Sequence, residues 1–151
     1  AAGTMRHLLD LSSSMEQAIA ASALRGFCEL AKVDHLIYKF RVYKVLFGLS
    51  GEDESQFASH TACRLGKWYY EGEGRDCFSQ LPGYREIEAP HKTVHDAALG
   101  ALRARANGNF TQVLELVATM ETASLSVLEG LERMALSGEQ NSQLLCKSLE
   151  G

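Results

Sequence analysis

Four side chains of types that bind metal ions are spaced widely along the chain. They are His35, Cys63, His91 and His95. His91 and His95 stand four positions apart in the segment EAPHKTVHDAAL, whose composition predicts a helix. Residues at positions i and i+4 of a helix lie on one face, so both imidazoles can bind one ion. Ala98 and Leu102 continue that face, which predicts that the two histidines point into the protein interior.

The place of this histidine pair, near the start of its predicted helix, favours metal binding. The positive end of a helix disfavours the imidazolium ion and favours the neutral imidazole that a metal requires. The residue after His91 is Lys92 rather than glutamate, so the HExxH pattern of metalloproteases is absent. The sequence also contains no glycine-rich phosphate loop, no nucleophile elbow and no paired carboxylates. We therefore expect that the protein is not an enzyme.

Cys63 lies in the segment HTACRLGKWYYEGEG, residues 60–74, and we expect it in the middle of a helix from Ser55 to about Tyr70. Its face of that helix is polar or small and consists of Gln56, Ser59, His60, Gly66, Lys67 and Tyr70. A structural cysteine prefers apolar neighbours, so this pattern predicts a functional thiol. Lys67, one turn further on, is expected to favour the thiolate, which binds metals better and is oxidised more easily. Gly66 is expected to let another helix approach closely.

His35 belongs to an apolar stripe with intervals of four and three residues, which predicts one face of a long helix. The stripe contains Leu24, Cys28, Ala31, His35, Tyr38, Val42, Val45 and Leu49. In sequence, 28 residues separate His35 from Cys63, and another 28 separate Cys63 from His91. In an antiparallel bundle these intervals let three neighbouring helices meet at one level. Three nitrogens and one sulfur form a closed tetrahedral set suited to one Zn²⁺ ion per protomer. Separate core roles for the four residues are the alternative.

The elements that must position these residues are predicted to be helices throughout. The fold expected is all-α, an antiparallel four-helix bundle with the zinc site inside it. A second stripe predicts the last helix: Phe110, Val113, Val117, Met120, Ser124, Val127, Leu131 and Met134. Ser55 is expected to cap the second helix, and Pro90 suits the first turn of a third helix that ends near Ala106. Asn109 and Gln112 form the capping-box pattern for the last helix.

The chain divides into three predicted parts. Residues 1–21 are expected to form a helical lead-in from an upstream signalling region, paired with a second copy or continuous with that region. Residues 22–137 are expected to form the bundle, and residues 138–151 a flexible polar tail.

The composition is typical of a soluble domain: of 151 residues, 46% are hydrophobic and 23% are charged. A net charge of −4 predicts no binding to nucleic acid or to an anionic membrane. No apolar run approaches the ~18 residues of a membrane span, and no secretory signal is visible. The four cysteines, Cys28, Cys63, Cys77 and Cys146, form no CxxC pair. We therefore expect a cytoplasmic protein whose thiols are free or metal-bound, with Cys77 available for intermolecular disulfides.

Three segments resemble the bacterial chemoreceptor zinc-binding (CZB) domain: LAKVDHLIYKFRVYKVLFG, HTACRLGKWYYEGEG and PHKTVH. The likeness extends over about Leu24–Leu136. The zinc ligands of that family, a histidine, a cysteine and two histidines in this order, fall on His35, Cys63, His91 and His95. The resemblance implies a cytoplasmic, homodimeric four-helix bundle that binds zinc. It also implies a domain that is attached to a chemoreceptor or a diguanylate cyclase or is found alone. In some members the resemblance implies the sensing of zinc or hypochlorous acid through the ligating cysteine.

On this resemblance the chain is a sensory domain, partnered by a parent chemoreceptor signalling domain and, through it, by the chemotaxis kinase array. Cys63 is then the redox-reactive residue. Asp34, Asp96, His60 and Lys67 are expected around the metal ligands, with solvated surface positions as the alternative. The same four ligands are also compatible with a purely structural zinc site in a dimerisation module, or with the regulatory domain of a diguanylate cyclase. A metal-dependent enzyme or an oxygen carrier would need inward-facing acids, which the sequence does not show.

Overall fold

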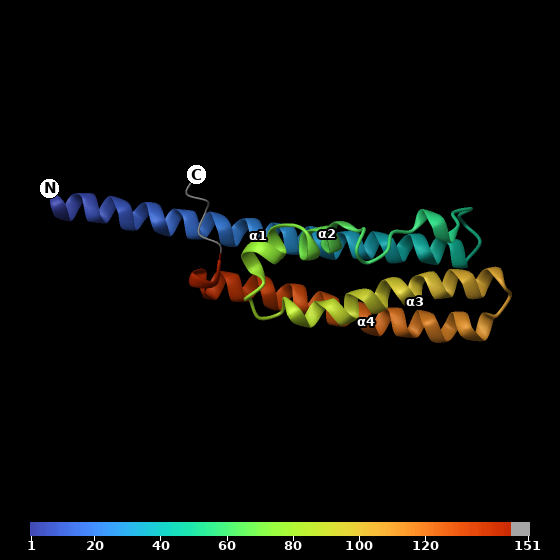
Figure 1. The fold of residues 1–151 in the computed structure, drawn as a ribbon. Helices are drawn as coiled ribbons and strands as arrows, with labels where there is room; N and C mark the ends of the chain where they lie inside the picture. Colours follow the sequence, from blue (N-terminus) through green and yellow to red (C-terminus); the bar gives the residue numbers. More distant parts are fainter. Residues whose placement is uncertain (146–151) are drawn as a thin grey trace.

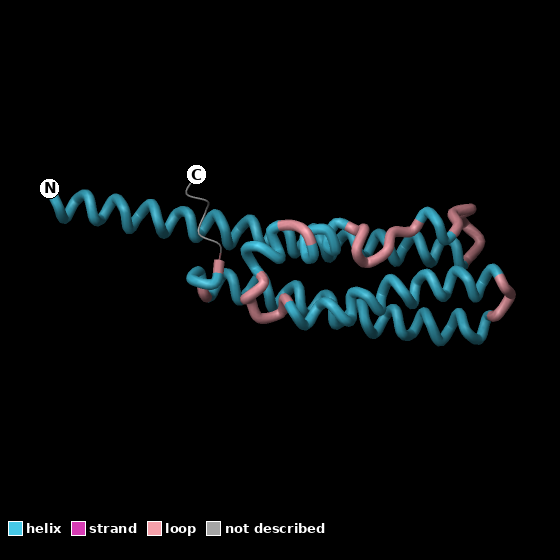
Figure 2. Tube along the Cα trace, viewed as in Figure 1, coloured by secondary structure: helices cyan, strands magenta, loops and turns pink. Residues whose placement is uncertain are grey.

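The computed structural model describes residues 1–145, which form helices joined by turns and irregular segments (Figure 1). The helices are α1 at Ala2–Leu46, α2 at Arg64–Tyr70, α3 at Glu88–Ala106 and α4 at Phe110–Gln140. One-turn 3₁₀ segments lie at Glu54–Gln56, Arg85–Ile87 and Ser142–Leu144, and a π-helical turn lies at Gly74–Phe78. No strand occurs in residues 1–145 (Figure 2). The prediction of an all-α bundle is confirmed.

The three long helices lie side by side, and the chain reverses direction from one element to the next (Figure 1). Residues 47–87 run back along α1 and carry the short helix α2, after which α3 runs in the same direction as α1. A tight turn at residues 107–109, where Gly108 has a φ of 72°, leads into the antiparallel helix α4. This order brings α1, α2 and α3 together around the middle of the bundle.

α1 is one continuous helix whose N-terminal part extends beyond the bundle (Figure 1). The side chains of residues 1–16 are all exposed. The predicted lead-in, residues 1–21, is therefore the N-terminal part of α1, with no break before the bundle. A rigid element of this kind can transmit a displacement from one end to the other.

The core follows the two stripes found in the sequence, with differences at their ends. Seven of the eight stripe residues of α1 are buried: Leu24, Cys28, Ala31, His35, Tyr38, Val42 and Val45. Leu49 is 73% exposed, because α1 ends at Leu46 and Gly48, with a φ of 73°, turns the chain away. In α4, Phe110 is 67% exposed and Val117 is half-buried, while the other six predicted residues are buried. Each large aliphatic side chain buried in this way stabilises the fold by about 1.5–3 kcal/mol.

The predicted helix from Ser55 to Tyr70 is wrong in its first half. Asp53 rather than Ser55 is the cap: its carboxylate accepts the N–H of Ser55 at 2.8 Å, and the Gln56 side chain accepts the N–H of Asp53 at 2.9 Å. This capping box stabilises only the 3₁₀ turn at residues 54–56, because Phe57 then adopts an extended conformation and is buried. The carbonyl of Ala58 accepts the Tyr38 hydroxyl at 3.2 Å instead of a helical N–H. Helical structure resumes at Arg64.

The last helix begins as predicted and ends later than predicted. The Asn109 side chain accepts the N–H of Gln112 at 3.1 Å, which is the predicted cap of α4. α4 continues to Gln140, three residues into the expected tail, and Leu145 is buried against the bundle. The predicted flexibility of the remaining tail concerns residues 146–151, which lie outside the described residues.

Candidate metal centre

Four side chains converge where α1, the start of α2 and the start of α3 meet. They are His35, Cys63, His91 and His95. The ligand atoms that they offer all lie within 4.8 Å of one another. The three histidines are at most 4% exposed, and Cys63 is half-buried. The structure thus brings together the four residues that the sequence singled out as metal ligands.

Two of the histidines are fixed in the tautomer that leaves Nε2 available. The Nδ1–H of His35 donates to the carbonyl of Ala31 at 2.8 Å, and that of His95 donates to the carbonyl of Ala58 at 2.8 Å. A carbonyl only accepts, so the proton is on Nδ1 and the lone pair is on Nε2. Both Nε2 atoms are buried without a hydrogen-bond partner. Buried unsatisfied acceptors are costly, and a metal ion bound by both atoms removes that cost.

Cys63 is the N-cap of α2 and does not lie in the middle of a helix, as the sequence had predicted. Its backbone is extended, with φ −72° and ψ 166°, and its sulfur accepts the N–H of Gly66 at 3.4 Å. The same sulfur lies 3.3 Å from Nε2 of His91. A helix N-terminus favours a thiolate over a thiol. Cys63 therefore combines two roles, a vertex of the cluster and the cap of α2.

The expected influence of Lys67 on the thiol stays a prediction. The Lys67 side chain is exposed. Burial raises the pKa of the Cys63 thiol, and the N–H groups of Gly66 and Leu65 lower it.

Gly66 also has a role that differs from the predicted one: a Cβ atom there would lie 1.9 Å from the carbonyl oxygen of His60. The close neighbour is thus the loop before Cys63 and not another helix.

The histidines of the cluster are held in their neutral form. Burial, followed by repulsion from the other histidines, lowers the pKa of His91 to about 2. Burial likewise lowers the pKa of His95 to about 4 and also lowers the pKa of His35. At neutral pH all three imidazoles are uncharged, as metal binding requires. With two orphaned Nε2 atoms, a third imidazole and a capping sulfur, the residues fit a zinc ion in both number and type.

The side chains expected around the ligands lie further out. Asp96 is exposed and pairs with Lys92, and Asp34 pairs with Arg64. The half-exposed ring of His60 lies 6.1 Å from that of His91, centroid to centroid, but His60 is outside the group of converging donors. Backbone carbonyls orient His35 and His95 in place of the two aspartates.

These carbonyl partners were missed by the sequence analysis. Ala31 lies one turn before His35, so the helical period could have identified its carbonyl. Nothing in the sequence identifies Ala58, because its carbonyl is turned toward His95 by the irregular segment that replaces the predicted helix.

Aromatic side chains hold α2 against α1 next to the cluster. The ring of Trp68 stacks on that of Phe27 in α1, with centroids 4.4 Å apart, and lies 5.9 Å from Phe78. The Tyr84 hydroxyl donates to the carbonyl of Tyr69 at 2.6 Å, and the two tyrosine rings stack at 4.2 Å. Trp68 and Tyr69 are thus packing residues within one chain.

The remaining cysteines differ in state. Cys28 is free and fully buried in the core, and burial raises the pKa of its thiol to about 12. Cys77 is disulfide-bonded, so the expectation of thiols that are all free or metal-bound is wrong for this residue. Cys146 lies outside the described residues.

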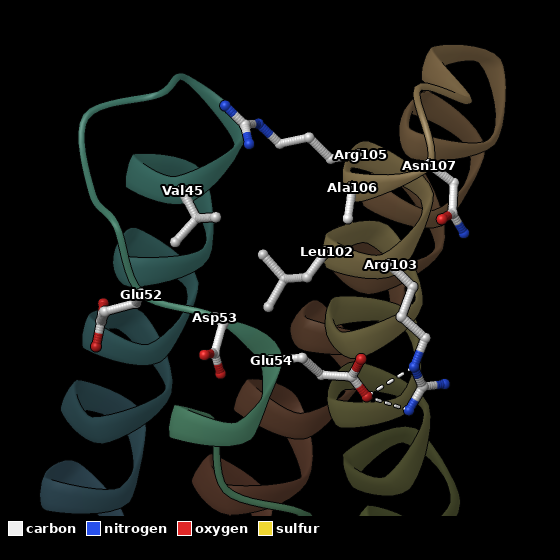
Figure 3. Close-up of a pocket in the computed structure, with 9 residues that line it drawn as sticks. All are labelled: Val45, Glu52, Asp53, Glu54, Leu102, Arg103, Arg105, Ala106 and Asn107. Atoms are coloured by element: carbon white, nitrogen blue, oxygen red, sulfur yellow. Dashed lines mark hydrogen bonds and ion pairs between the residues drawn. The ribbon is translucent and has the colours of Figure 1, made fainter.

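A pocket of about 360 Å³ lies away from the cluster, between the end of α1, the segment at residues 52–54 and the end of α3 (Figure 3). Its charged groups are already paired. Glu54 binds Arg103, as drawn in Figure 3, and Glu52 binds Arg41. Arg105 donates to the carbonyl of Leu46 at 3.0 Å. The cluster of histidines and cysteine is therefore the stronger candidate for a functional site.

Comparison with known families identifies the segment that carries the cluster. Residues 35–102 match the model of the chemoreceptor zinc-binding domain. This segment is a CZB domain. It begins at His35, includes the other three residues of the cluster and ends within α3. No curated protein and no solved structure gave a match.

The CZB match and the geometry of the cluster support the same conclusion, that this is a zinc-binding sensory domain with a metal site between three of its helices. The all-helical fold agrees with that assignment. Within residues 1–145, no helix combines the length and the apolar character needed to cross a bilayer.

Proposed function

We propose that this CZB domain detects hypochlorous acid through Cys63 and regulates an attached chemotaxis signalling domain. The observation that carries the proposal is the double role of the Cys63 sulfur. It lies among the converging donors and also caps α2. A chemical change at one atom therefore alters both the metal site and the position of a helix.

The metal in this proposal is Zn²⁺, one ion per protomer, held by His35, Cys63, His91 and His95. Three neutral imidazoles and one thiolate match the preferred donors and coordination number of zinc. When bound, zinc keeps the cysteine deprotonated and joins the three elements that supply the ligands. All four donors come from the protein, so the site has no open position for a substrate, which supports a role without catalysis.

The sensing step is a two-electron oxidation of Cys63. The thiolate attacks hypochlorous acid, and the overall change is S⁻ + HOCl → S–OH + Cl⁻, in which sulfur is oxidised and chlorine is reduced to chloride. The product is uncharged and is a weaker donor to a metal. It is also a weaker acceptor for the N–H of Gly66. Oxidation therefore weakens the metal site and the cap of α2 together.

The output is a movement of α2 relative to α1. Trp68 of α2 stacks on Phe27 of α1, eight residues before His35. α1 continues from Phe27 toward the N-terminus as one helix. A difference of a few kcal/mol between the two positions of α2 is enough to switch their populations. Free zinc acts on the same switch by occupying or leaving the site, and the signalling domain and chemotaxis kinase array receive the output upstream.

We further propose that the domain is a homodimer in which α1 contacts its counterpart. The outer side of α1 carries exposed apolar residues at intervals of three and four: Leu30, Val33, Ile37, Phe40 and, after one missing step, Phe47. Met5, Leu8, Met15 and Ile19 form a similar stripe in the lead-in. Exposed stripes of this spacing are typical of paired helices, and a second copy supplies a matching face.

We place the domain in the cytoplasm, where chemoreceptor output domains act. The disulfide at Cys77 is unusual in that compartment. Fractionation of the cells that make the protein tests the placement. We expect the domain in the cytoplasmic fraction, and recovery from another fraction would contradict the placement.

A purely structural zinc module is the second candidate, since the same residues can hold the fold together. It predicts that an oxidant has no effect until the protein unfolds. A regulatory domain of a diguanylate cyclase shares the sensing step and differs only in the attached output.

The experiment that separates these functions is a titration of the zinc-loaded protein with hypochlorous acid. Released zinc per protomer and helicity are followed together in the wild type, Cys63→Ser and Cys28→Ser. Cys28→Ser is the matched control because it removes the other cysteine that is free within residues 1–145. We expect the wild type and the control to release zinc at about one oxidant equivalent while they stay helical, and Cys63→Ser not to respond. Zinc release that coincides with loss of helicity would support the structural module instead.

A further inference from the structure

An ion pair joins α1 to the start of α2 directly beside two of the cluster residues. Asp34 precedes His35 in α1, and Arg64 follows Cys63 as the first residue of α2. The Arg64 Nε atom lies 3.2 Å from Oδ2 of Asp34. The pair therefore spans the same two elements as His35 and Cys63 do, one residue away from each.

The carboxylate of Asp34 depends on this partner. Its Oδ2 atom is buried and makes no hydrogen bond, so the charge of Arg64 is its compensation. A buried carboxylate oxygen without a nearby cation is costly. The side chains of Arg64 and Asp34 are 55% and 33% exposed, so solvent partly screens the pair. Separation of α2 from α1 therefore has an electrostatic cost even when no metal is bound.

A second ion pair beside the cluster provides a contrast. Lys92 follows His91 and Asp96 follows His95, so both of its members are also adjacent to cluster residues in sequence. Both lie in α3, however, and their side chains are 58% and 55% exposed. This pair connects one turn of a helix to the next and joins no separate elements.

We propose that Asp34 and Arg64 are positioning residues for the sulfur vertex of the metal centre. The ion pair keeps the N-terminus of α2 against α1, so that Cys63 stays close to His35 before the metal binds. The inference rests on the proposed metal centre and adds a tether that the metal does not provide. Its consequence is preorganisation: the ion binds donors that are already in place.

The size of the effect follows from the exposure of the pair. Partly exposed ion pairs contribute up to about 1 kcal/mol, which corresponds to about a fivefold change in a binding constant. Removal of either member should therefore weaken metal binding by up to about fivefold. Removal of both should weaken it no further, because the second member has no partner left to hold.

Co²⁺ is the probe, because its charge-transfer absorption from sulfur reports the Cys63–metal bond, while its other bands report overall binding. Metal-free wild type, Asp34→Asn, Arg64→Gln and the double variant are titrated with Co²⁺, and far-UV circular dichroism checks their folding. Arg64→Lys keeps the charge and is expected to retain most of the wild-type affinity. Asp96→Asn is the matched control and is expected to bind as the wild type does.

The direction in which each single variant changes the Co²⁺ affinity distinguishes a tether from a simple charge effect. If the charges act only through their field on the cation, Asp34→Asn weakens binding and Arg64→Gln strengthens it. If the pair is a tether, both variants weaken binding, by up to about fivefold, and lower the sulfur band preferentially. The proposal is overturned if Asp34→Asn and Arg64→Gln change the Co²⁺ affinity in opposite directions, or if all variants bind Co²⁺ as tightly as the wild type does. It is also overturned if Asp96→Asn weakens Co²⁺ binding as much as they do. A wild type that takes up no Co²⁺ and no Zn²⁺ refutes the metal centre itself.

If Asp34→Asn does not fold, the proposal is tested with Arg64→Gln and Arg64→Lys alone. Position 64 is the more exposed one, and both changes there keep a long side chain. An Arg64→Gln protein with unchanged Co²⁺ affinity and sulfur band contradicts the proposal.

Discussion

The sulfur of Cys63 lies 3.3 Å from Nε2 of His91, although 28 residues separate the two in the chain. This contact joins the N-terminus of α2 to the first turn of α3. The same sulfur also accepts the N–H of Gly66 in α2. The chemistry of one atom is thereby linked to the placement of a helix, which is the basis of the proposed sensor.

Gly66 is required by the close approach of the loop that precedes Cys63. In Gly66→Ala, the new Cβ would meet the carbonyl of His60 at 1.9 Å, so the loop or α2 must move. We expect a loss of about 1–3 kcal/mol in the free energy of unfolding, measured by chemical denaturation of the metal-free protein. Gly51→Ala is the control, since nothing lies within 4 Å of a Cβ there. Equal stability of the two variants would show that the loop is not packed against α2.

Cys28 and Cys63, the cysteines that are free in the described part of the chain, should differ in their rates of alkylation. Burial raises the pKa of Cys28 to about 12, so at about pH 8 only about one Cys28 in 10,000 is a thiolate. Burial raises the pKa of Cys63 too, but this side chain is only half-buried, and the N–H groups of Gly66 and Leu65 oppose the increase. We expect iodoacetamide to label Cys63 of the native, metal-free protein and to leave Cys28 unlabelled, as measured by peptide mass spectrometry. Since ionisation increases with pH, labelling of Cys28 should appear only as the pH approaches 12 or the protein unfolds. Early labelling of Cys28 would contradict its placement in the core.

The stacking of Phe27 on Trp68 should link the cluster to the lead-in. Phe27→Ala removes a ring 4.4 Å from the chain's single tryptophan. We expect a shift of the Trp68 emission to longer wavelength and a loss of about 2 kcal/mol in the free energy of unfolding. Phe110→Ala, at a ring that is 67% exposed, serves as the control and should change neither quantity much. An unchanged emission spectrum in Phe27→Ala would remove this contact from the proposed signal path.

The dimer proposal predicts that a charge on the outer side of α1 separates the protomers. Ile37 is 54% exposed in one chain, so glutamate at this position leaves the fold of the protomer intact. We expect Ile37→Glu to sediment as a monomer at concentrations where the wild type sediments as a dimer, because each dimer would bury two charges. Leu125→Glu places the same charge at a 61% exposed position of α4 and should remain dimeric. If only Leu125→Glu dissociates, the interface lies on α4 and the proposed one is wrong.

The sequence by itself determined which residue types can bind the metal and which helix faces carry the three histidines. The stripe of α1 and the spacing of His91 and His95 depend on the helical period, which is a local property. The cap at Asn109 is also local, since Asn109 and its partner are three residues apart. These features could be predicted because neighbours along the chain decide them.

Only the tertiary structure decided how Cys63 takes part. A helix from Ser55 fits the local pattern, but Phe57 is buried in an extended conformation and the Ala58 carbonyl serves the side chains of Tyr38 and His95. Those partners come from α1 and α3, and no local pattern contains them. Burial of Phe57 and two hydrogen bonds from distant side chains outweigh the weak preference of residues 57–63 for helix. The helix therefore starts at Arg64, and the cysteine before it becomes both cap and ligand candidate.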